Sequence, residues 1–317
     1  MKYAQPTSRR TFLGTAAAAV VASSRRPAAQ PARTEPRRLR LGGPVFVSSD
    51  DPAELAEAHR ALGYRAAYAP PVELKDTERI AAIRREFEAR DIVLAEVGAW
   101  VNALDPDPDK RARNVAYITE RLAVAEALGA RCCVTIAGSF NTEVWYGPHP
   151  GNFSREFFDL TVETTRRIID AVKPTRTKYS LEMMGWAIPS GPEEYADLLR
   201  AVDRPEFGVH LDVCNAVNSP TRMYQNGALI RRCFELLGPW ILSCHAKDVD
   251  WIPEMQIHFV EVIPGRGLVD YRALLDGLAG LPQDVPVMME HLQTAEEYAE
   301  GAAYIRRVGA ELGITFD

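Results

Sequence analysis

The sequence predicts a (β/α)8 barrel, an α/β fold, as a single domain over residues 38–317. Eight short apolar segments alternate with eight amphipathic ones at a spacing of roughly 30 residues. Four of the apolar segments end on an acidic residue or a histidine, as strands that converge on one site would. The competing fold, a doubly wound open sheet, would carry a Gly-rich phosphate loop after an early strand. Residues 41–44, Leu-Gly-Gly-Pro, lack the third glycine of such a loop, and Pro44 has no N–H to donate.

The strand predictions rest on short runs of β-branched and apolar residues. In residues 207–212, period-2 alternation places His210 and Asp212 on the same face of the strand. A long loop is expected over 137–154, and another runs from the seventh strand to Gly267. The eight predicted strands are residues 38–47 (with the chain's exit), 65–68, 92–97, 132–136, 179–182, 207–212, 241–245 and 285–290.

The helix predictions rest on capping residues and on apolar residues at helical spacing. Asp51 caps the first helix, with Pro52 at its first position, and Gly129 closes the third. The eight predicted helices are residues 52–62, 77–89, 107–128, 155–172, 192–202, 222–237, 271–278 and 295–312.

The sequence of residues 1–33 predicts an export signal followed by a short linker. Ser8-Arg9-Arg10-Thr-Phe-Leu precedes an alanine-rich apolar run, which is typical of the twin-arginine route. The apolar run is too short to span a bilayer as a mature helix, so no stable membrane span is expected. The sequence therefore predicts a periplasmic or secreted protein, exported folded by the twin-arginine machinery.

The composition is that of a soluble globular protein, with 47% hydrophobic and 25% charged residues. The net charge is −6, and because residues 1–33 hold six basic and no acidic residues, the rest of the chain is more negative still. An acidic protein suits a cationic cofactor better than a nucleic-acid partner. The five cysteines have no zinc-type spacing, and export after folding in the reducing cytosol argues against a structural disulfide.

Four potential metal ligands close predicted strands five to eight: Glu182, Asp212, His245 and Glu290. In a barrel, the carboxyl ends of neighbouring strands surround one pocket. Three carboxylates in one pocket would repel each other and be partly protonated unless a cation were bound. Three carboxylates and an imidazole suit one divalent cation, Mn²⁺ first, with Mg²⁺, Co²⁺ and Zn²⁺ as alternatives.

The most specific stretch is His245-Ala-Lys-Asp followed by residues 264–270, Pro-Gly-Arg-Gly-Leu-Val-Asp. With Leu181-Glu182, His210-Leu-Asp212 and Glu290, it makes the chain resemble the sugar phosphate isomerase/epimerase family, the xylose isomerase-like TIM barrels. The resemblance extends from about residue 39 to the end and is firmest from strand five onward. It implies a divalent metal held by the four residues named above, with the two glutamates doubling as acid/base groups.

The chemistry that the resemblance implies begins with loss of a proton from a carbon next to a carbonyl. The product is an enediolate, which a bound cation stabilises. Glu182 and Glu290 would share the tasks of taking this proton and returning it. The expected activity is therefore metal-dependent isomerisation or epimerisation of a sugar.

Further residues are expected to bind the substrate. His210 would orient a hydroxyl or a metal-bound oxygen, or would instead lie in the core bonded to backbone. Lys247 would neutralise an enediolate oxygen, or would form a rim salt bridge with Asp248. Glu96 ends strand three and faces the pocket, where it could bind a hydroxyl. Aromatic residues of the loops would bind the apolar face of a sugar ring: Trp100, Trp145, Tyr146, Trp186 and Trp251.

Two alternatives to an isomerase remain open. A lyase or dehydratase could use the same enolate chemistry on an oxidised glycoside or a keto acid, and a non-catalytic periplasmic sugar-binding protein is a third reading. Asn215, Ile188 and Trp251 stand where the ketohexose epimerase branch of the family has a histidine, a glutamate and an arginine, which argues against free ketohexoses. With only six histidines, a three-zinc nuclease site is not expected. No feature of the sequence selects an oligomeric state.

Overall fold

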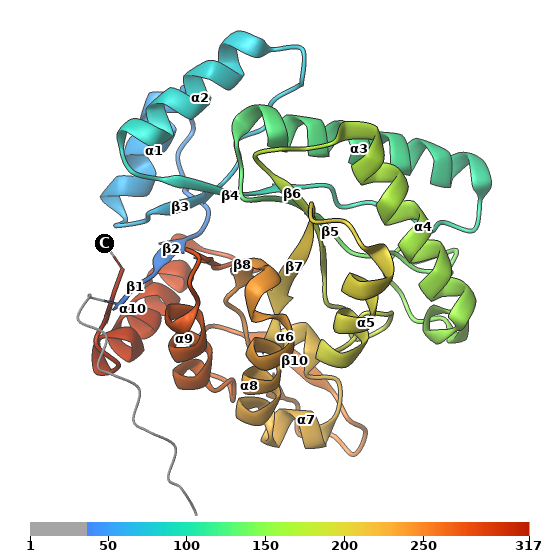
Figure 1. Cartoon of the computed structure of the whole chain (residues 1–317). Helices are drawn as coiled ribbons and strands as arrows, with labels where there is room; N and C mark the ends of the chain where they lie inside the picture. Colours follow the sequence, from blue (N-terminus) through green and yellow to red (C-terminus); the bar gives the residue numbers. More distant parts are fainter. Residues whose placement is uncertain (1–36, 317) are drawn as a thin grey trace, which may run out of the picture. The chain divides into compact units, whose positions relative to one another are not determined.

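The computed structural model describes residues 37–316, in which eight parallel strands close into a barrel (Figure 1). Their order is β11-β2-β3-β4-β5-β6-β7-β8, so the last barrel strand pairs with the first. This closure confirms the predicted fold class and turns all strand carboxyl ends to one mouth. The strands are β2 (Arg40–Gly42), β3 (Ala66–Tyr68), β4 (Val93–Gly98), β5 (Cys132–Thr135), β6 (Lys178–Glu182), β7 (Phe207–Asp212), β8 (Ile241–His245) and β11 (Pro286–Met288).

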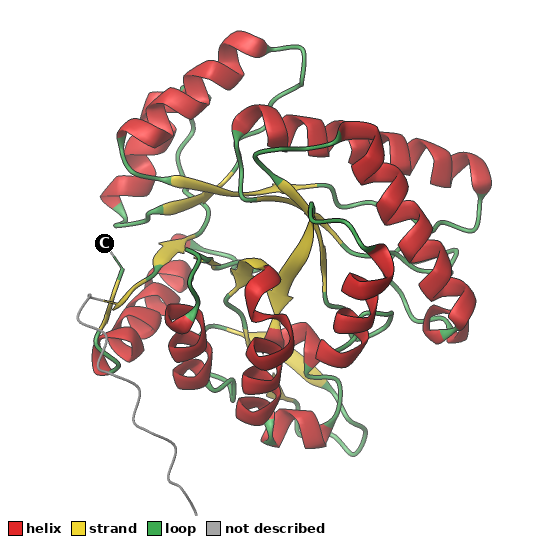
Figure 2. Cartoon of the chain, viewed as in Figure 1, coloured by secondary structure: helices red, strands yellow, loops and turns green. Residues whose placement is uncertain are grey.

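The longer helices surround the strands (Figure 2). Asp51 caps the first of them as predicted, accepting hydrogen bonds from the backbone N–H groups of Ala53 and Glu54. Gly129 closes the third with φ 71°, a left-handed conformation that suits glycine. These helices are α1 (Pro52–Ala61), α2 (Thr77–Ala89), α3 (Pro108–Leu128), α4 (Arg155–Val172), α5 (Pro192–Val202), α8 (Asn226–Leu237), α9 (Tyr271–Gly280) and α10 (Ala295–Glu311).

Several shorter elements interrupt the simple alternation, and the predicted helix 222–237 is divided. Ser219 caps a first short helix that ends at Tyr224, and a second helix begins at Asn226. Gln225 lies between them with φ −112° and ψ 21°, which is not a helical conformation. The shorter elements outside the barrel wall are β1 (Arg37–Arg38), η1 (Pro150–Phe153), α6 (Val213–Ala216), α7 (Pro220–Tyr224), η2 (Gly238–Trp240) and β12 (Ile314–Thr315).

The long loop predicted after the seventh strand is instead an antiparallel hairpin. It consists of β9 (Asp248–Trp251) and β10 (Phe259–Val262), paired from Asp248 with Val262 to Trp251 with Phe259. Both strands are only four residues long, and β10 is largely exposed. Strands this short, which bury little apolar surface, have a weak period-2 pattern, which is why no residue pattern indicated the hairpin.

Asp248 organises the segment that links this hairpin to α9. Its side chain is fully buried and accepts four backbone hydrogen bonds, from the N–H groups of Val249, Gly265, Gly267 and Val269, at 2.8–3.0 Å. A side chain at position 267 would collide with this carboxylate, so glycine is required there. One acidic residue therefore holds the whole Pro-Gly-Arg-Gly stretch in place.

Apolar side chains of the strands and helices form a continuous core, and all five cysteines are buried and free. The hydroxyl of Tyr195 on α5 ties the site-bearing strands together, lying 2.6 Å from the carbonyl oxygen of Leu181 on β6 and 2.9 Å from that of Gly208 on β7. Among the described residues, no helix combines the length and hydropathy needed to cross a membrane. The export signal predicted for residues 1–33 lies outside the described range.

Candidate metal centre

Four side chains from four successive strands meet at the barrel mouth. Glu182, Asp212 and His245 are the last residues of β6, β7 and β8, and Glu290 follows β11 by two residues. One ligand atom from each lies within 4.8 Å of the ligand atoms of the other three. His245 Nδ1 is 3.1 Å from Glu182 Oε1, 3.7 Å from Asp212 Oδ2 and 2.9 Å from Glu290 Oε1. The residues that the sequence selected as ligands are thus brought to a common point.

The cluster fits a divalent cation in two ways. Carboxylate oxygens with one imidazole nitrogen are a donor set that Mn²⁺, Mg²⁺ and related ions accept. In addition, Asp212 Oδ2 and Glu290 Oε1 are buried and accept no hydrogen bond, although cationic side chains lie within ion-pair distance. Lys247 brings one positive charge to three carboxylates, so a divalent cation would compensate the negative charge that remains.

The three carboxyls of the cluster differ in how burial and the neighbouring positive charges shift their pKa values. Burial raises the pKa of Glu182 above its ordinary value, and attraction to His245 only partly offsets this. Burial acts against the charged form of His245 too, but Glu96, Tyr68 and the neighbouring glutamates outweigh it and hold the pKa of this histidine well above its usual range. At Asp212 and Glu290, Lys247 and His245 outweigh burial and lower the pKa of both carboxyls, so Glu182 alone of the three resists ionisation, beside a histidine that retains its proton. A cation bound at Nδ1 would displace that proton.

Lys247 lies inside the cluster, not on the barrel rim. Its ammonium is 2.7 Å from Asp212 Oδ2, 3.0 Å from Glu290 Oε1 and 3.3 Å from Glu261 Oε1, and its side chain is 3% exposed. The alternative of a rim salt bridge with Asp248 is therefore wrong, because that carboxylate is occupied by backbone N–H groups. A buried ammonium among carboxylates is well placed to meet an oxyanion that enters the site.

Glu96 and His210 lie one layer deeper than the four ligands, and their burial does not favour the substrate contact predicted for them. Glu96 is 1% exposed and His210 is fully buried. His210 precedes Asp212 by two residues, so the period of the strand gives it the same face but a deeper level of the barrel. The oxygens of Glu96 contact His210 Nε2 at 2.9 Å, His245 Nε2 at 3.2 Å and the hydroxyl of Ser243. Both side chains thus lie behind the ligand His245 as seen from the mouth.

A comparison with protein-family models decides the family. The model described as the xylose isomerase-like TIM barrel matches residues 56–308, which is most of the chain. The protein belongs to the xylose isomerase-like TIM barrel family. The match confirms the resemblance carried by the His-Ala-Lys-Asp stretch and the four ligands.

Solved structures share the fold of this xylose isomerase-like barrel at low sequence identity. A xylose isomerase-like TIM barrel protein from Mycobacterium smegmatis in complex with magnesium is 17% identical, with a TM-score of 0.59 over 87% of this chain and 96% of that one. The 3-keto-D-glucoside 4-epimerase from E. coli is 12% identical (TM-score 0.60, 85% and 100% covered). Endonuclease IV from Thermus thermophilus is 18% identical (0.63, 86% and 99%). A comparison with curated protein sequences gave no match.

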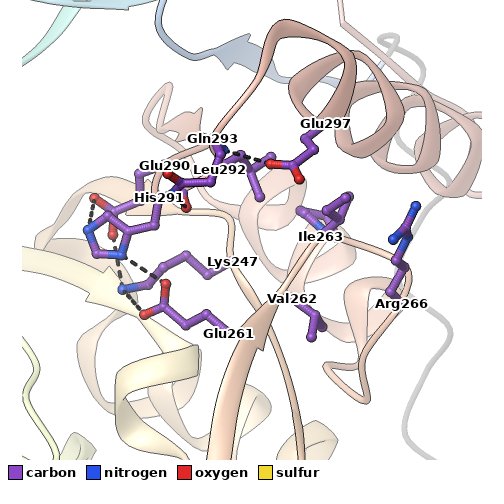
Figure 3. Close-up of a pocket in the computed structure, with 11 residues that line it drawn as sticks. Lys247, Glu261, Val262, Ile263, Arg266, Glu290, His291, Leu292, Gln293 and Glu297 are labelled. Atoms are coloured by element: carbon purple, nitrogen blue, oxygen red, sulfur yellow. Dashed lines mark hydrogen bonds and ion pairs between the residues drawn. The ribbon is translucent and has the colours of Figure 1, made fainter.

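Beside the four-ligand cluster, the xylose isomerase-like barrel has a pocket of about 330 Å³. Figure 3 shows Lys247, Glu261 and His291 gathered at one end of this pocket and Arg266 at the other. His291 Nδ1 is 2.8 Å from Glu261 Oε2, and His291 adopts a φ of 62°, the left-handed region that residues other than glycine seldom occupy. The pocket is polar along much of its lining, which includes Glu290, Gln293 and Glu297.

Asn215 and Glu261 are site residues that sequence reasoning missed. Asn215 bridges the cluster, because its Nδ2 donates to Glu182 Oε1 at 3.0 Å and its Oδ1 accepts from Lys247 at 3.1 Å. The sequence feature that could have identified Asn215 is its position three residues after the ligand Asp212, because one helical turn brings such a side chain back to the same site. Glu261 had no signal, because it reaches Lys247 only through the unpredicted hairpin.

The loop aromatics retain large exposed surfaces. The ring of Trp100 is 42% exposed and its centroid lies 6.5 Å from that of His245. Tyr146, Trp186 and Trp251 are also about half exposed, with values from 49% to 56%. Contact between Trp100 and a substrate remains a prediction, and the position of this ring next to a ligand of the cluster is compatible with it.

Proposed function

We propose that the protein is a divalent-metal-dependent sugar isomerase or epimerase that works through an enediolate, with Glu182 and Glu290 as acid and base. The observation that carries the proposal is the convergence of Glu182, Asp212, His245 and Glu290, with the Lys247 ammonium among them. A sugar-binding protein without catalytic activity would gain nothing from three buried carboxylates at one point, since burying charge is costly. Mn²⁺ is the proposed ion.

Proton transfer follows from the placement of the two glutamates. A cation bound by the four ligands would polarise the substrate carbonyl and favour loss of the neighbouring proton. Glu182 comes from β6 and Glu290 follows β11, so the two carboxylates enter the site from separate strands. One of them takes the proton from carbon, and the other returns a proton to the opposite face or to the adjacent carbon. Lys247 stabilises the developing oxyanion, and Asn215 fixes the orientation of Glu182.

The polar pocket and the exposed aromatics support a hydroxylated substrate. Glu261, His291 and Gln293 offer donors and acceptors for hydroxyl groups beside the cluster. Trp100 and the neighbouring loop aromatics offer apolar faces for a ring. We also propose, from residues 1–33, that the protein is exported by the twin-arginine route to the periplasm or beyond. Its substrates would then be scavenged sugars and sugar derivatives.

Solvent deuterium exchange tests the proposed reaction. The Mn²⁺-loaded protein is incubated in D₂O with free sugars, oxidised sugars and glycosides, and the products are analysed by NMR. We expect deuterium at the carbon next to the carbonyl, together with an isomer or epimer of the substrate. Exchange accompanied by loss of an aglycone or of water would establish the lyase instead. Conversion without any exchange would contradict the enediolate route.

A further inference from the structure

Beneath the proposed metal centre lies a fully buried polar network that the proposed chemistry does not use. Its members are Glu96 on β4, His210 on β7 and Ser243 on β8, and it reaches upward to the ligand His245. None of these four side chains is more than 2% exposed. A buried carboxylate so far from solvent is expensive, so its retention calls for a compensating role.

The two nitrogens of His245 face different partners. Nδ1 points to the carboxylates of Glu182 and Glu290, at 3.1 and 2.9 Å, whereas Nε2 points to Glu96 Oε2 at 3.2 Å. A histidine that binds a cation through Nδ1 is neutral and must carry its proton on Nε2. Glu96 is the only described side chain that the structure places within hydrogen-bond distance of that Nε2.

Glu96 is itself held in place by donors. Its Oε1 contacts His210 Nε2 at 2.9 Å and accepts the hydroxyl of Ser243, so rotation of the carboxylate would break two interactions. The ring of His210 packs edge-on against His245 with centroids 4.1 Å apart, and this contact further limits the ring of the ligand.

We propose that Glu96 is a positioning residue for the metal centre. Its carboxylate fixes the tautomer and the ring orientation of His245 and so makes this histidine a stronger ligand. The proposal rests on the proposed function, because it presupposes that His245 binds a cation. Glu96, His210 and His245 could in principle hold a second ion, since their ligand atoms also cluster. Glu96 Oε1 already accepts the Ser243 hydroxyl as well as contacting His210 Nε2, which favours a hydrogen-bonded network.

The test measures metal affinity, not turnover. Titration calorimetry with Mn²⁺ is carried out on the wild type, on Glu96→Gln and on Ser243→Ala. Glutamine keeps the shape but presents an amide in place of the charged acceptor, so the affinity of Glu96→Gln should fall by about 10–100-fold, the usual effect of losing such a partner. Ser243→Ala removes one donor to Glu96 and should cause a smaller loss. It also tests the proposal if Glu96→Gln does not fold.

Matched controls separate positioning from general destabilisation. Glu126→Gln changes a glutamate that accepts backbone N–H groups of residues 175–177, before β6. Ser180→Ala removes a buried hydroxyl that donates to the carbonyl of Cys133 and has no contact with Glu96 or His245 among the hydrogen bonds of the described residues. Neither control should change Mn²⁺ affinity. In Glu96→Gln the loss should be larger for Zn²⁺ than for Mg²⁺, because imidazole contributes more to binding Zn²⁺.

The outcomes are distinct. Weaker binding in Glu96→Gln with unchanged controls supports the proposal, as does the graded effect of Ser243→Ala. Unchanged affinity in both Glu96→Gln and Ser243→Ala, with one Mn²⁺ bound by the wild type, overturns the positioning role and leaves the proposed function standing. Two ions per wild-type chain, one of them lost in Glu96→Gln, would show that Glu96 is a ligand. Absence of binding to the wild type overturns the proposed function and this inference with it.

Discussion

Replacing Glu182 or Glu290 with glutamine is expected to lower kcat by about 10²–10⁴-fold, the range in which a positioned acid or base contributes. Glutamine keeps the size and one acceptor oxygen, but it cannot carry the transferred proton. Because both residues are also proposed ligands, kcat is measured at saturating Mn²⁺ and the bound metal is quantified. The variants should remain inactive when the metal is fully loaded.

A matched control for this pair is Glu193→Gln on the outer helix α5, where the exposed carboxylate pairs with Arg232 at 2.9 Å. It should retain the wild-type kcat. The two active-site variants should also differ in deuterium exchange, because only one glutamate removes the proton from carbon. Wild-type turnover in both Glu182→Gln and Glu290→Gln would refute the acid/base assignment.

Asp248→Ala is expected to cost about 3 kcal/mol or more of unfolding free energy, because four backbone N–H groups lose their acceptor and each buried one costs about 1–3 kcal/mol. Asp248→Asn retains one carbonyl oxygen and should lose roughly half as much. The measurement is urea unfolding in excess EDTA, so that metal release does not contribute.

The neighbouring residue supplies the control for this second prediction. Asp250 lies two residues further along β9 and accepts only the N–H of Trp251, in an exposed position. Asp250→Ala should cost less than about 1 kcal/mol, as surface changes usually do. Equal losses for the Asp248 and Asp250 variants would show that the four hydrogen bonds do not organise the segment at 263–269.

The sequence predicted the barrel because eight strand-helix units recur at a spacing of roughly 30 residues and four of the strands end on an acidic residue or a histidine. The four-ligand cluster followed, because strand ends at one mouth must meet. Local sequence patterns could not show how deep in the barrel each side chain lies. His210 shares a strand face with Asp212, and only the closed barrel shows that it lies a layer below, in contact with Glu96 across the interior.

The remaining misses have a common physical cause. The β9–β10 hairpin buries little apolar surface, so it has no periodic pattern, and Glu261 reaches Lys247 only because this hairpin folds over the mouth. His291 follows a ligand directly, but its place in the pocket depends on a left-handed backbone conformation that no residue pattern announces. Contacts that depend on tertiary geometry were therefore those that sequence reasoning missed.

The central claim is that one divalent cation is held by Glu182, Asp212, His245 and Glu290. Mn²⁺ titration of the metal-free protein, followed by electron paramagnetic resonance, tests it most directly. The account predicts one site per chain and no such site in Asp212→Ala, which lacks a buried ligand oxygen. An undiminished site in Asp212→Ala, or no Mn²⁺ bound by the wild type, would contradict it.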